Sequence, residues 1–318
     1  MNAKHVILGI LGAVILTTMP RGAVGTVQAA DTCDRQCLFG VVEQYLNAMV
    51  AHDPSKAPIA EGAKFTENGQ KLTLPDGLWR IASGLRDYRN LVAEPAKGAV
   101  GGFAVVEENG IPVILGLRLQ VENQKITEME TIVLRKAGGN FSDPDNLKTP
   151  RPDFARIEPA NTRRSRDELI RIANTYFTAL QNNDGSVHPP FADDCDRLEN
   201  GVRTTNNPEF KSSTLTASPA SMTCKEAFGL GFYREDTRLR DRRWPIVDTE
   251  RGVVFAGVFF DHDAVLRSYQ LTNGETVHVQ KTAPWTWEIF EMFKIHDGMI
   301  GAVEAVVNGV PYGMDPGW

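Results

Sequence analysis

The densest run of polar chemistry in the sequence is residues 191–205, which include Cys195, Arg197, Glu199 and Arg203. If this run forms a strand, alternation places Arg197, Glu199 and Arg203 on one face. A carboxylate between guanidinium groups stays ionised and can orient a substrate hydroxyl or carboxylate. The same arrangement is also typical of a structural ion network that fixes a loop, so the sequence leaves both interpretations open.

The tripeptide Glu-Asn-Gly occurs twice, at residues 67–69 and 199–201. Each copy lies a similar distance after a segment with apolar residues at three- and four-residue spacing, residues 33–53 and 165–184, and that spacing predicts a helix. The echo indicates an internal duplication. It makes Glu67, as the counterpart of the second glutamate, a candidate ligand-binding residue.

Glu130 and Glu304 form a second matched pair, because residues 121–130 align with residues 295–304. In a strand each would share its face with apolar residues. These neighbours are Ile126, Ile132 and Leu134 for Glu130, and Ile300, Ala302 and Val306 for Glu304. A carboxylate in such surroundings has a raised pKa and can act as a general acid or base. The alternative is a solvated rim position or a pair with arginine.

His262 is a further candidate for proton transfer, since Asp261 and Asp263 flank it at the end of an apolar run. Adjacent strand residues point to opposite faces, so neither aspartate need contact the ring, and a surface turn is the favoured interpretation. No histidine or cysteine has the spacing of a metal site, so we predict no metal.

Three aromatic residues, Tyr233, Trp287 and Tyr312, are candidates for lining an apolar ligand pocket, although ordinary core packing is the alternative for each. The chain has no phosphate loop, dinucleotide fingerprint, exposed-serine elbow or zinc motif. We therefore expect no cofactor.

Residues 1–29 resemble a cleaved export signal, with a basic start, an apolar run and small residues before Ala29. Its loss would remove Lys4 and Arg21 and no acidic residue, which changes the formal charge from −6 to −8. That charge argues against a nucleic-acid partner or an anionic membrane surface. No later run is long and apolar enough to span a membrane, so we predict a secreted or periplasmic protein.

All four cysteines lie in the predicted exported part. An even count in such a chain favours disulfides, and four cysteines allow three connectivities. Proximity in the sequence favours Cys33–Cys37 and Cys195–Cys224.

Apolar and β-branched runs around Asn-Gly or Asp-Gly turns predict hairpins in both parts of the chain. The predicted strands are residues 102–107, 112–121, 125–134, 244–247, 253–260, 285–295 and 299–307. We predict one α+β domain at residues 30–135, a linker at 136–164 and a second domain at 165–318. Asn140, in the linker, is a potential glycosylation acceptor.

One predicted strand offers apolar side chains to both of its faces. Leu115, Leu117 and Leu119 alternate with Ile114 and Gly116, and Val303 and Val307 likewise oppose Ile300 and Val306. A sheet with two apolar faces needs cover on both, helices on one and the other sheet on the other. We therefore predict an intrachain pseudo-dimer, with two independent domains as the alternative.

The helix with its Tyr45-Leu-Asn-Ala-Met49 core, the aspartate that ends it and the closing hairpin resemble the cone-shaped SnoaL-like (nuclear transport factor 2-like) fold, over residues 40–135 and 165–312. Three segments, residues 195–201, 247–252 and 310–314, look like an uncharacterised family of exported tandem proteins. The resemblance implies two cones, each with helices packed on a curved antiparallel sheet. The superfamily contains dehydratases, isomerases, cyclases, lyases and binding modules, so membership alone decides no chemistry.

Two functions are compatible with these features. The first is cofactor-free acid–base chemistry on a small organic substrate, such as elimination, dehydration or isomerisation, with Glu304, Glu199 and Arg197 as the principal candidates and His262 as a further one. The second is a module that binds a small molecule without turning it over. The richer polar segment favours the second half as the site in either case.

Overall fold

The computed structural model describes Met1 and residues 33–136, 141–210, 215–216 and 218–318. The predicted export signal and Asn140 lie outside the described residues. From Thr32 to Trp318 the chain forms one compact unit. Among the described residues, no helix has the length and apolar character needed to cross a membrane.

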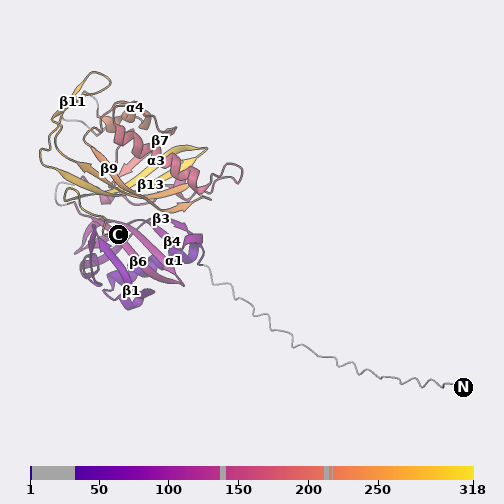
Figure 1. Ribbon diagram of the computed structural model, residues 1–318. Coiled ribbons are helices and arrows are strands. Elements are labelled where there is room, and N and C mark those ends of the chain that lie inside the picture. The colour runs from indigo at the N-terminus through magenta and orange to yellow at the C-terminus, as the bar shows by residue number, and fades with distance from the viewer. Residues whose placement is uncertain (2–32, 137–140, 211–214, 217) are drawn as a thin grey trace. The chain divides into compact units, whose positions relative to one another are not determined.

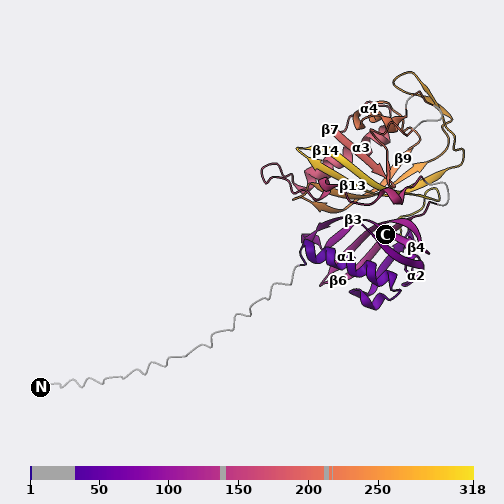
Figure 2. The same cartoon turned by 180° about the vertical axis from the view of Figure 1, so that it is seen from behind.

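The first half packs helix α1 on a six-stranded sheet in the strand order β2-β1-β6-β5-β4-β3. Its elements are α1 (Arg35–Val50), β1 (Ile59–Glu67), β2 (Gln70–Lys71), α2 (Leu78–Ile81), β3 (Ala82–Glu94), β4 (Ala99–Glu108), β5 (Ile111–Glu122) and β6 (Lys125–Leu134). Asp34 caps α1 by accepting a hydrogen bond from the Cys37 amide. Figure 1 shows this half in indigo and purple, and Figure 2 shows it from behind.

The second half repeats the same order, β8-β7-β14-β13-β10-β9, with α3 on its sheet (Figure 1). Its elements are α3 (Arg166–Asn182), β7 (Phe191–Glu199), β8 (Val202–Arg203), α4 (Cys224–Gly229), β9 (Arg238–Asp248), β10 (Val253–His262), β11 (Ser268–Gln270), β12 (Thr276–His278), β13 (Trp285–His296) and β14 (Met299–Val310). Ser165 and Glu168 form a capping box at the start of α3.

The predicted α+β fold in tandem is confirmed: each half consists of a six-stranded sheet with a long helix packed on it. Each sheet is mixed rather than wholly antiparallel, because β1 runs parallel to β6 and β7 runs parallel to β14. The first half also contains a long strand that the sequence did not predict. This is the 13-residue strand β3, whose charged residues hid the alternation in the sequence.

The two sheets contact each other through one face of each. A buried cluster combines Phe103 and Ile114 from the first half with Phe255, Phe290 and Val306 from the second. Leu115, Leu117 and Leu119 point the other way, into the core beneath α1. The predicted packing of the halves through their sheets is therefore present.

Two residues lie on the opposite face from the one predicted. Ile126 belongs to the core beneath α1, and Ile300 belongs to the core beneath α3. The register of strand pairing shifts next to each of them. The shift lies between Gln120 and Val121 on β5, which pairs with β6, and between Lys294 and Ile295 on β13, which pairs with β14. One extra residue reverses the face of everything beyond it, which strict alternation does not anticipate.

The described part of the segment that connects the halves, from residue 141 onward, is packed against the sheets. It contains two short 3₁₀ helices, η3 (Pro144–Asn146) and η4 (Pro152–Ala155), and buries Leu147 and Phe154 in the cluster between the sheets. Lys294 in β13 fixes it further, since its ammonium group donates to Arg156 O at 3.0 Å and lies 2.6 Å from the carboxylate of Glu158.

Both predicted disulfides are confirmed, Cys33–Cys37 and Cys195–Cys224. The second ties β7 to α4, which lies in a segment of the second half that has no equivalent of similar length in the first. Two disulfides indicate that the protein matures in an oxidising environment.

Removing the Cys195–Cys224 bridge with paired alanine substitutions is expected to lower the free energy of unfolding by about 3 kcal/mol, because it closes a loop of 29 residues. Removing Cys33–Cys37, which closes a loop of 4, should cost less. Urea unfolding of the two variants measures both losses. Equal losses would contradict the expectation.

Candidate functional site

A cavity of about 370 Å³ opens into the second half, between α3 and the sheet. Its walls are mainly aromatic and aliphatic, with a few ionisable groups among them. The lining residues are Phe141, Tyr176, Leu180, Arg197, Glu199, Phe232, Tyr233, Glu235, Asp236, Phe260, His262, Val277, His278, Gln280, Lys281, Trp285, Trp287, Ile289, Glu291 and Val307. An apolar cavity with a few converging polar groups is typical of a small-molecule site.

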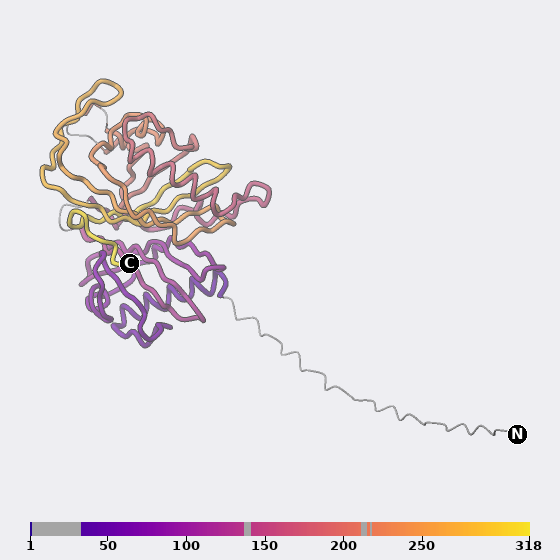
Figure 3. The backbone as a smooth tube through the Cα atoms, viewed as in Figure 1, coloured from indigo at the N-terminus to yellow at the C-terminus, as the bar shows by residue number. Residues whose placement is uncertain are grey.

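Two long connections of the second half supply much of this wall. The chain between β8 and β9 contributes Tyr233 and Asp236, and the chain between β10 and β13 contributes Val277 and Lys281. Figure 3 shows the latter leaving the sheet as a loop and returning. In the first half β4 and β5 are joined by a two-residue turn, and Trp79 is fully buried beside Tyr45, the counterpart of Tyr176.

Arg197 and Glu199 project from β7 on the same face, as predicted for a strand. The Arg197 guanidinium is buried, donates to the Tyr233 hydroxyl at 2.6 Å and bonds to the Glu199 carboxylate. It also lies over the ring of Tyr176, at 5.5 Å. Its Nε is buried with no hydrogen-bond partner among the described residues.

Glu291, on β13, also lines the cavity, and nothing in its local sequence pattern marks it as a site residue. Burial and, to a smaller extent, the negative charge of Glu199 together raise its pKa to about 8, while Arg197 opposes the shift. At neutral pH the group is therefore mostly a neutral carboxylic acid, able to donate a hydrogen bond or a proton into an apolar cavity.

His262 is the last residue of β10, and its ring is held on three sides. Nε2 lies 2.8 Å from the Asp236 carboxylate, and both side chains are buried. The ring stacks on Trp285, its cross-strand partner, at 4.0 Å, and meets Trp287 edge to face. If Nε2 carries the proton that Asp236 accepts, Nδ1 keeps a lone pair, and Nδ1 has no partner among the described residues.

The predicted surface turn at His262 is wrong, because the residue is the buried end of β10. The flanking aspartates do not contact the ring: Asp261 accepts hydrogen bonds from Arg238, Arg240 and Thr286 instead. The partner is Asp236, 26 residues away in a connection with no periodic pattern. Five of the predicted site residues thus line one cavity, namely Arg197, Glu199, Tyr233, His262 and Trp287.

Glu304 does not line this cavity and lies between the two sheets. It accepts hydrogen bonds from the Tyr88 hydroxyl and, at 2.9 Å, from Asn90, both in the first half, and Arg151 lies 3.6 Å away. Burial raises its pKa. The predicted apolar surroundings are present through Ala302 and Val306, but they belong to the face that meets the other sheet.

Glu130 occupies the matching place in the first half. It accepts hydrogen bonds from Arg118 at 2.9 Å and from both terminal nitrogens of Arg243, which belongs to the second half. Both glutamates therefore lie beside arginine, which is the alternative that the sequence also allowed. We do not propose either glutamate for catalysis.

Three other predicted ligand-binding residues also lie away from the cavity. Glu67 accepts a hydrogen bond from the Leu78 amide at 2.7 Å, and burial raises its pKa. Arg203 is exposed on β8 and pairs with Asp196, because the turn at residues 199–201 reverses the chain. Tyr312 follows the last strand and is 46% exposed.

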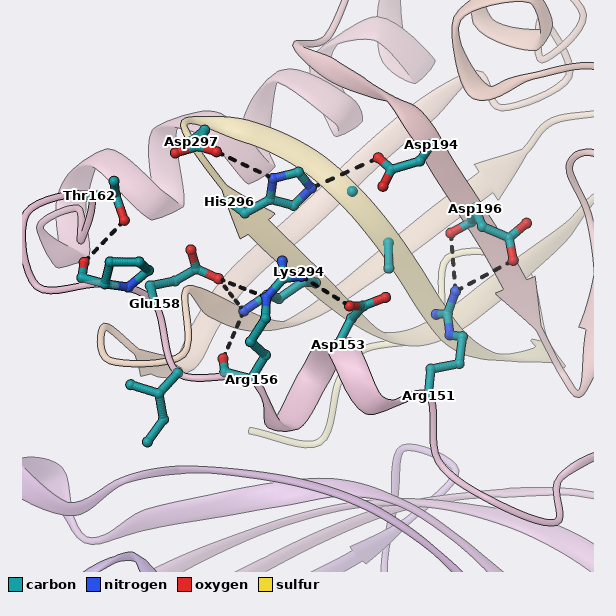
Figure 4. A pocket seen from close by; sticks show the side chains of 14 residues that line it. Arg151, Asp153, Arg156, Glu158, Thr162, Asp194, Asp196, Lys294, His296 and Asp297 are labelled. Carbon is teal, nitrogen blue, oxygen red and sulfur yellow. Dashed lines mark hydrogen bonds and ion pairs between the residues drawn. The ribbon is translucent and has the colours of Figure 1, made fainter.

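A second, strongly polar cavity of about 450 Å³ lies beside the connecting segment. Figure 4 shows that its charged side chains largely pair with one another, for example Lys294 with Glu158 and Arg151 with Asp196. Among the described residues, no group of acids, histidines and cysteines is arranged to hold a metal ion. The paired charges hold the connecting segment in place, and the cavity offers little apolar surface to a ligand.

The fold and cavity define a tandem α+β protein with a small-molecule type of pocket in its second half. A family model described as Domain of unknown function (DUF8021) matches residues 31–133 and 162–307, so the chain belongs to that family. The two matched stretches fall in the two halves.

Solved structures similar to this chain each cover a little under half of it. They include AusH from Aspergillus nidulans (16% identity, 45% of this chain and 86% of that one, TM-score 0.29) and AclR, a putative hydroxylase from Streptomyces galilaeus (15%, 45% and 91%, 0.27). A further one is an NTF2-like protein from Cytophaga hutchinsonii (16%, 46% and 99%, 0.26). Comparison with curated proteins gives no match.

Proposed function

We propose that the protein is an exported, cofactor-free acid–base enzyme that binds a mainly apolar small organic molecule in the cavity of its second half. The observation that carries this proposal is the buried His262–Asp236 pair in the same cavity as the neutral carboxyl of Glu291. Such a cavity offers a proton acceptor and a proton donor at one ligand. The two disulfides support export to an oxidising compartment.

In this proposal each group has a separate role. His262 Nδ1 removes a proton from the ligand, and Asp236 holds the ring and balances the charge that develops on it. Glu291 gives a proton, or a hydrogen bond, to the oxygen that gains electron density. Arg197 and Glu199 hold Tyr233 and the polar end of the cavity in place. Elimination, dehydration and isomerisation each need only this pair of proton transfers.

The test begins with a thermal-shift screen of small organic compounds against the full chain, because a ligand that binds only the native state raises its stability. Compounds that bind are then followed for conversion. His262→Gln is expected to retain binding and to slow conversion by about 10²–10⁴-fold, the usual contribution of a positioned base. Asp236→Asn should slow it in the same direction.

His278→Gln is the matched control, because His278 also lines the cavity but is exposed and pairs with no carboxylate of the described residues. It should convert the compound at nearly the wild-type rate. Conversion that His262→Gln leaves unchanged would reject the assigned base. If compounds bind and none is converted, the second function, a binding module without catalysis, describes the protein.

A further inference from the structure

The connecting segment between the halves reaches the cavity of the second half. Phe141, which precedes η3, is one of the lining residues, although it follows the last strand of the first half. We propose that Phe141 forms a fixed part of the wall of this cavity and limits the size of ligand it accepts, and that Asn200 positions Phe141 by holding residues 141–147 in place. This inference rests on the proposed function only in taking the cavity as the ligand site.

Asn200 is the middle residue of the second Glu-Asn-Gly turn and is 1% exposed. Its side-chain Nδ2 donates to Phe141 O and to Val307 O, each at 3.0 Å, and its Oδ1 accepts from the Val307 amide at 2.8 Å. Its own carbonyl accepts from the Asp143 amide at 2.8 Å. One buried amide therefore joins the turn, strand β14 and the connecting segment.

The approach of the segment to the turn is close. A Cβ atom at position 201 would lie 2.1 Å from Asp143 O, so only glycine permits the contact. Gly201 also has φ +77°, which favours glycine independently. Asn146 adds a hydrogen bond to Gly201 O at 3.2 Å, and Leu147 anchors the far end of the segment in the buried cluster between the sheets.

The residues that Asn200 touches are also residues of the site. Phe141 and Val307, which it bonds, line the cavity, and so does Glu199, its neighbour in the chain. A change in this amide would thus move three parts of the wall together. That coupling distinguishes Asn200 from an ordinary turn residue.

The first half contains a natural control for this arrangement. Asn68, in the first Glu-Asn-Gly turn, makes the same pair of bonds with Val133, at 2.8 Å and 3.3 Å. The chain that leaves the last strand of the second half covers this turn: a Cβ at Gly69 would lie 2.4 Å from Met314, and Trp318 donates to Thr66 at 3.0 Å. Each half is therefore covered by the exit segment of the other.

The experiment compares Asn200→Asp with Asn68→Asp in the full chain. Each change keeps the Oδ1 acceptor and removes the Nδ2 donor. The probe is N-phenyl-1-naphthylamine, a neutral aromatic compound that fluoresces in apolar cavities. We expect Asn200→Asp to weaken its binding by about fivefold or more, the effect of a lost hydrogen bond or two. Asn68→Asp should stay within about twofold of wild type. Equal losses would reduce Asn200 to a purely structural role and overturn the proposal.

A second readout needs no ligand. Hydrogen exchange at the Asp143 amide should become about tenfold faster or more in Asn200→Asp, because the segment opens locally, and should not change in Asn68→Asp. An unchanged rate in Asn200→Asp would overturn the anchoring role even if probe binding changed.

Phe141→Ala tests the limit on ligand size. The quantity measured is the ratio of the affinity for N-phenyl-1-naphthylamine to the affinity for the smaller 1-naphthol. This ratio should rise by about threefold or more in the variant, because removing the ring lengthens the cavity. An unchanged ratio, or a wild-type protein that binds neither probe, would overturn the size role. Conversion tests that fail while these three results hold would count against the proposed catalysis alone.

Discussion

Replacing Glu130 by alanine is expected to lower the free energy of unfolding by about 3–5 kcal/mol, which is the usual cost of removing one partner from a buried ion pair. The side chain of Glu130 is 2% exposed and accepts from Arg118 and from Arg243. Without it, two guanidinium groups would remain between the sheets without their shared carboxylate. Urea unfolding measures the loss.

Glu128→Ala is the matched control, because Glu128 bonds to the same Arg118 at 2.8 Å but is 40% exposed. An exposed ion pair contributes about 0–1 kcal/mol. Similar losses of stability in the two variants would contradict a special contribution from the buried ion pairs of Glu130 between the sheets. We also expect both halves of the wild-type protein to unfold in one transition, because the buried cluster between the sheets contains residues of both halves.

Glu291→Gln is expected to flatten the dependence of stability on pH between about pH 5 and pH 8. The folded-state pKa of Glu291 is raised to about 8 by burial, whereas an unfolded glutamate titrates near 4.3. The folded state therefore binds the proton more tightly. Its contribution is present in full below the unfolded pKa and is lost as pH rises through the folded pKa, at up to about 1.4 kcal/mol per pH unit.

Glutamine keeps the shape and cannot ionise, so the variant should gain stability relative to wild type as pH rises across this window. Parallel pH profiles for the two proteins would contradict the assignment of a neutral carboxyl. Glu288→Gln is the comparison: burial raises the pKa of Glu288 to about 8 as well, but Glu288 does not line the cavity. Glu288→Gln should flatten the pH dependence of the free energy of unfolding to a similar extent, while leaving the pH dependence of N-phenyl-1-naphthylamine binding unchanged.

Several features of this protein follow from local sequence alone. The two helices and seven of the strands were predicted near their observed positions, because apolar spacing and Asn-Gly or Asp-Gly turns are local signals. The disulfide pairs followed from proximity in the chain. The duplication followed from the Glu-Asn-Gly echo, and both copies of that turn occupy the same place in the two sheets, between β1 and β2 and between β7 and β8.

Whether the two strand glutamates, Glu130 and Glu304, face a cavity or the other sheet depends on long-range packing. Alternation showed that Glu130 and Glu304 share a face with apolar residues, but it could not say which layer covers that face. Both faces of each sheet are apolar in the sequence, since one meets a helix and the other meets the second sheet. The side of the sheet that holds the cavity is therefore a tertiary property.

The catalytic candidates show the same division. Arg197 and Glu199 could be placed on one face from the sequence, because residues two apart in a strand always share a side. The partner of His262 could not, because Asp236 lies in a long connection whose path is set by the Cys195–Cys224 bridge and by packing. The raised pKa of Glu291 and the arrival of Phe141 from the other half depend on burial and on contacts across many residues. Only the tertiary structure determines these.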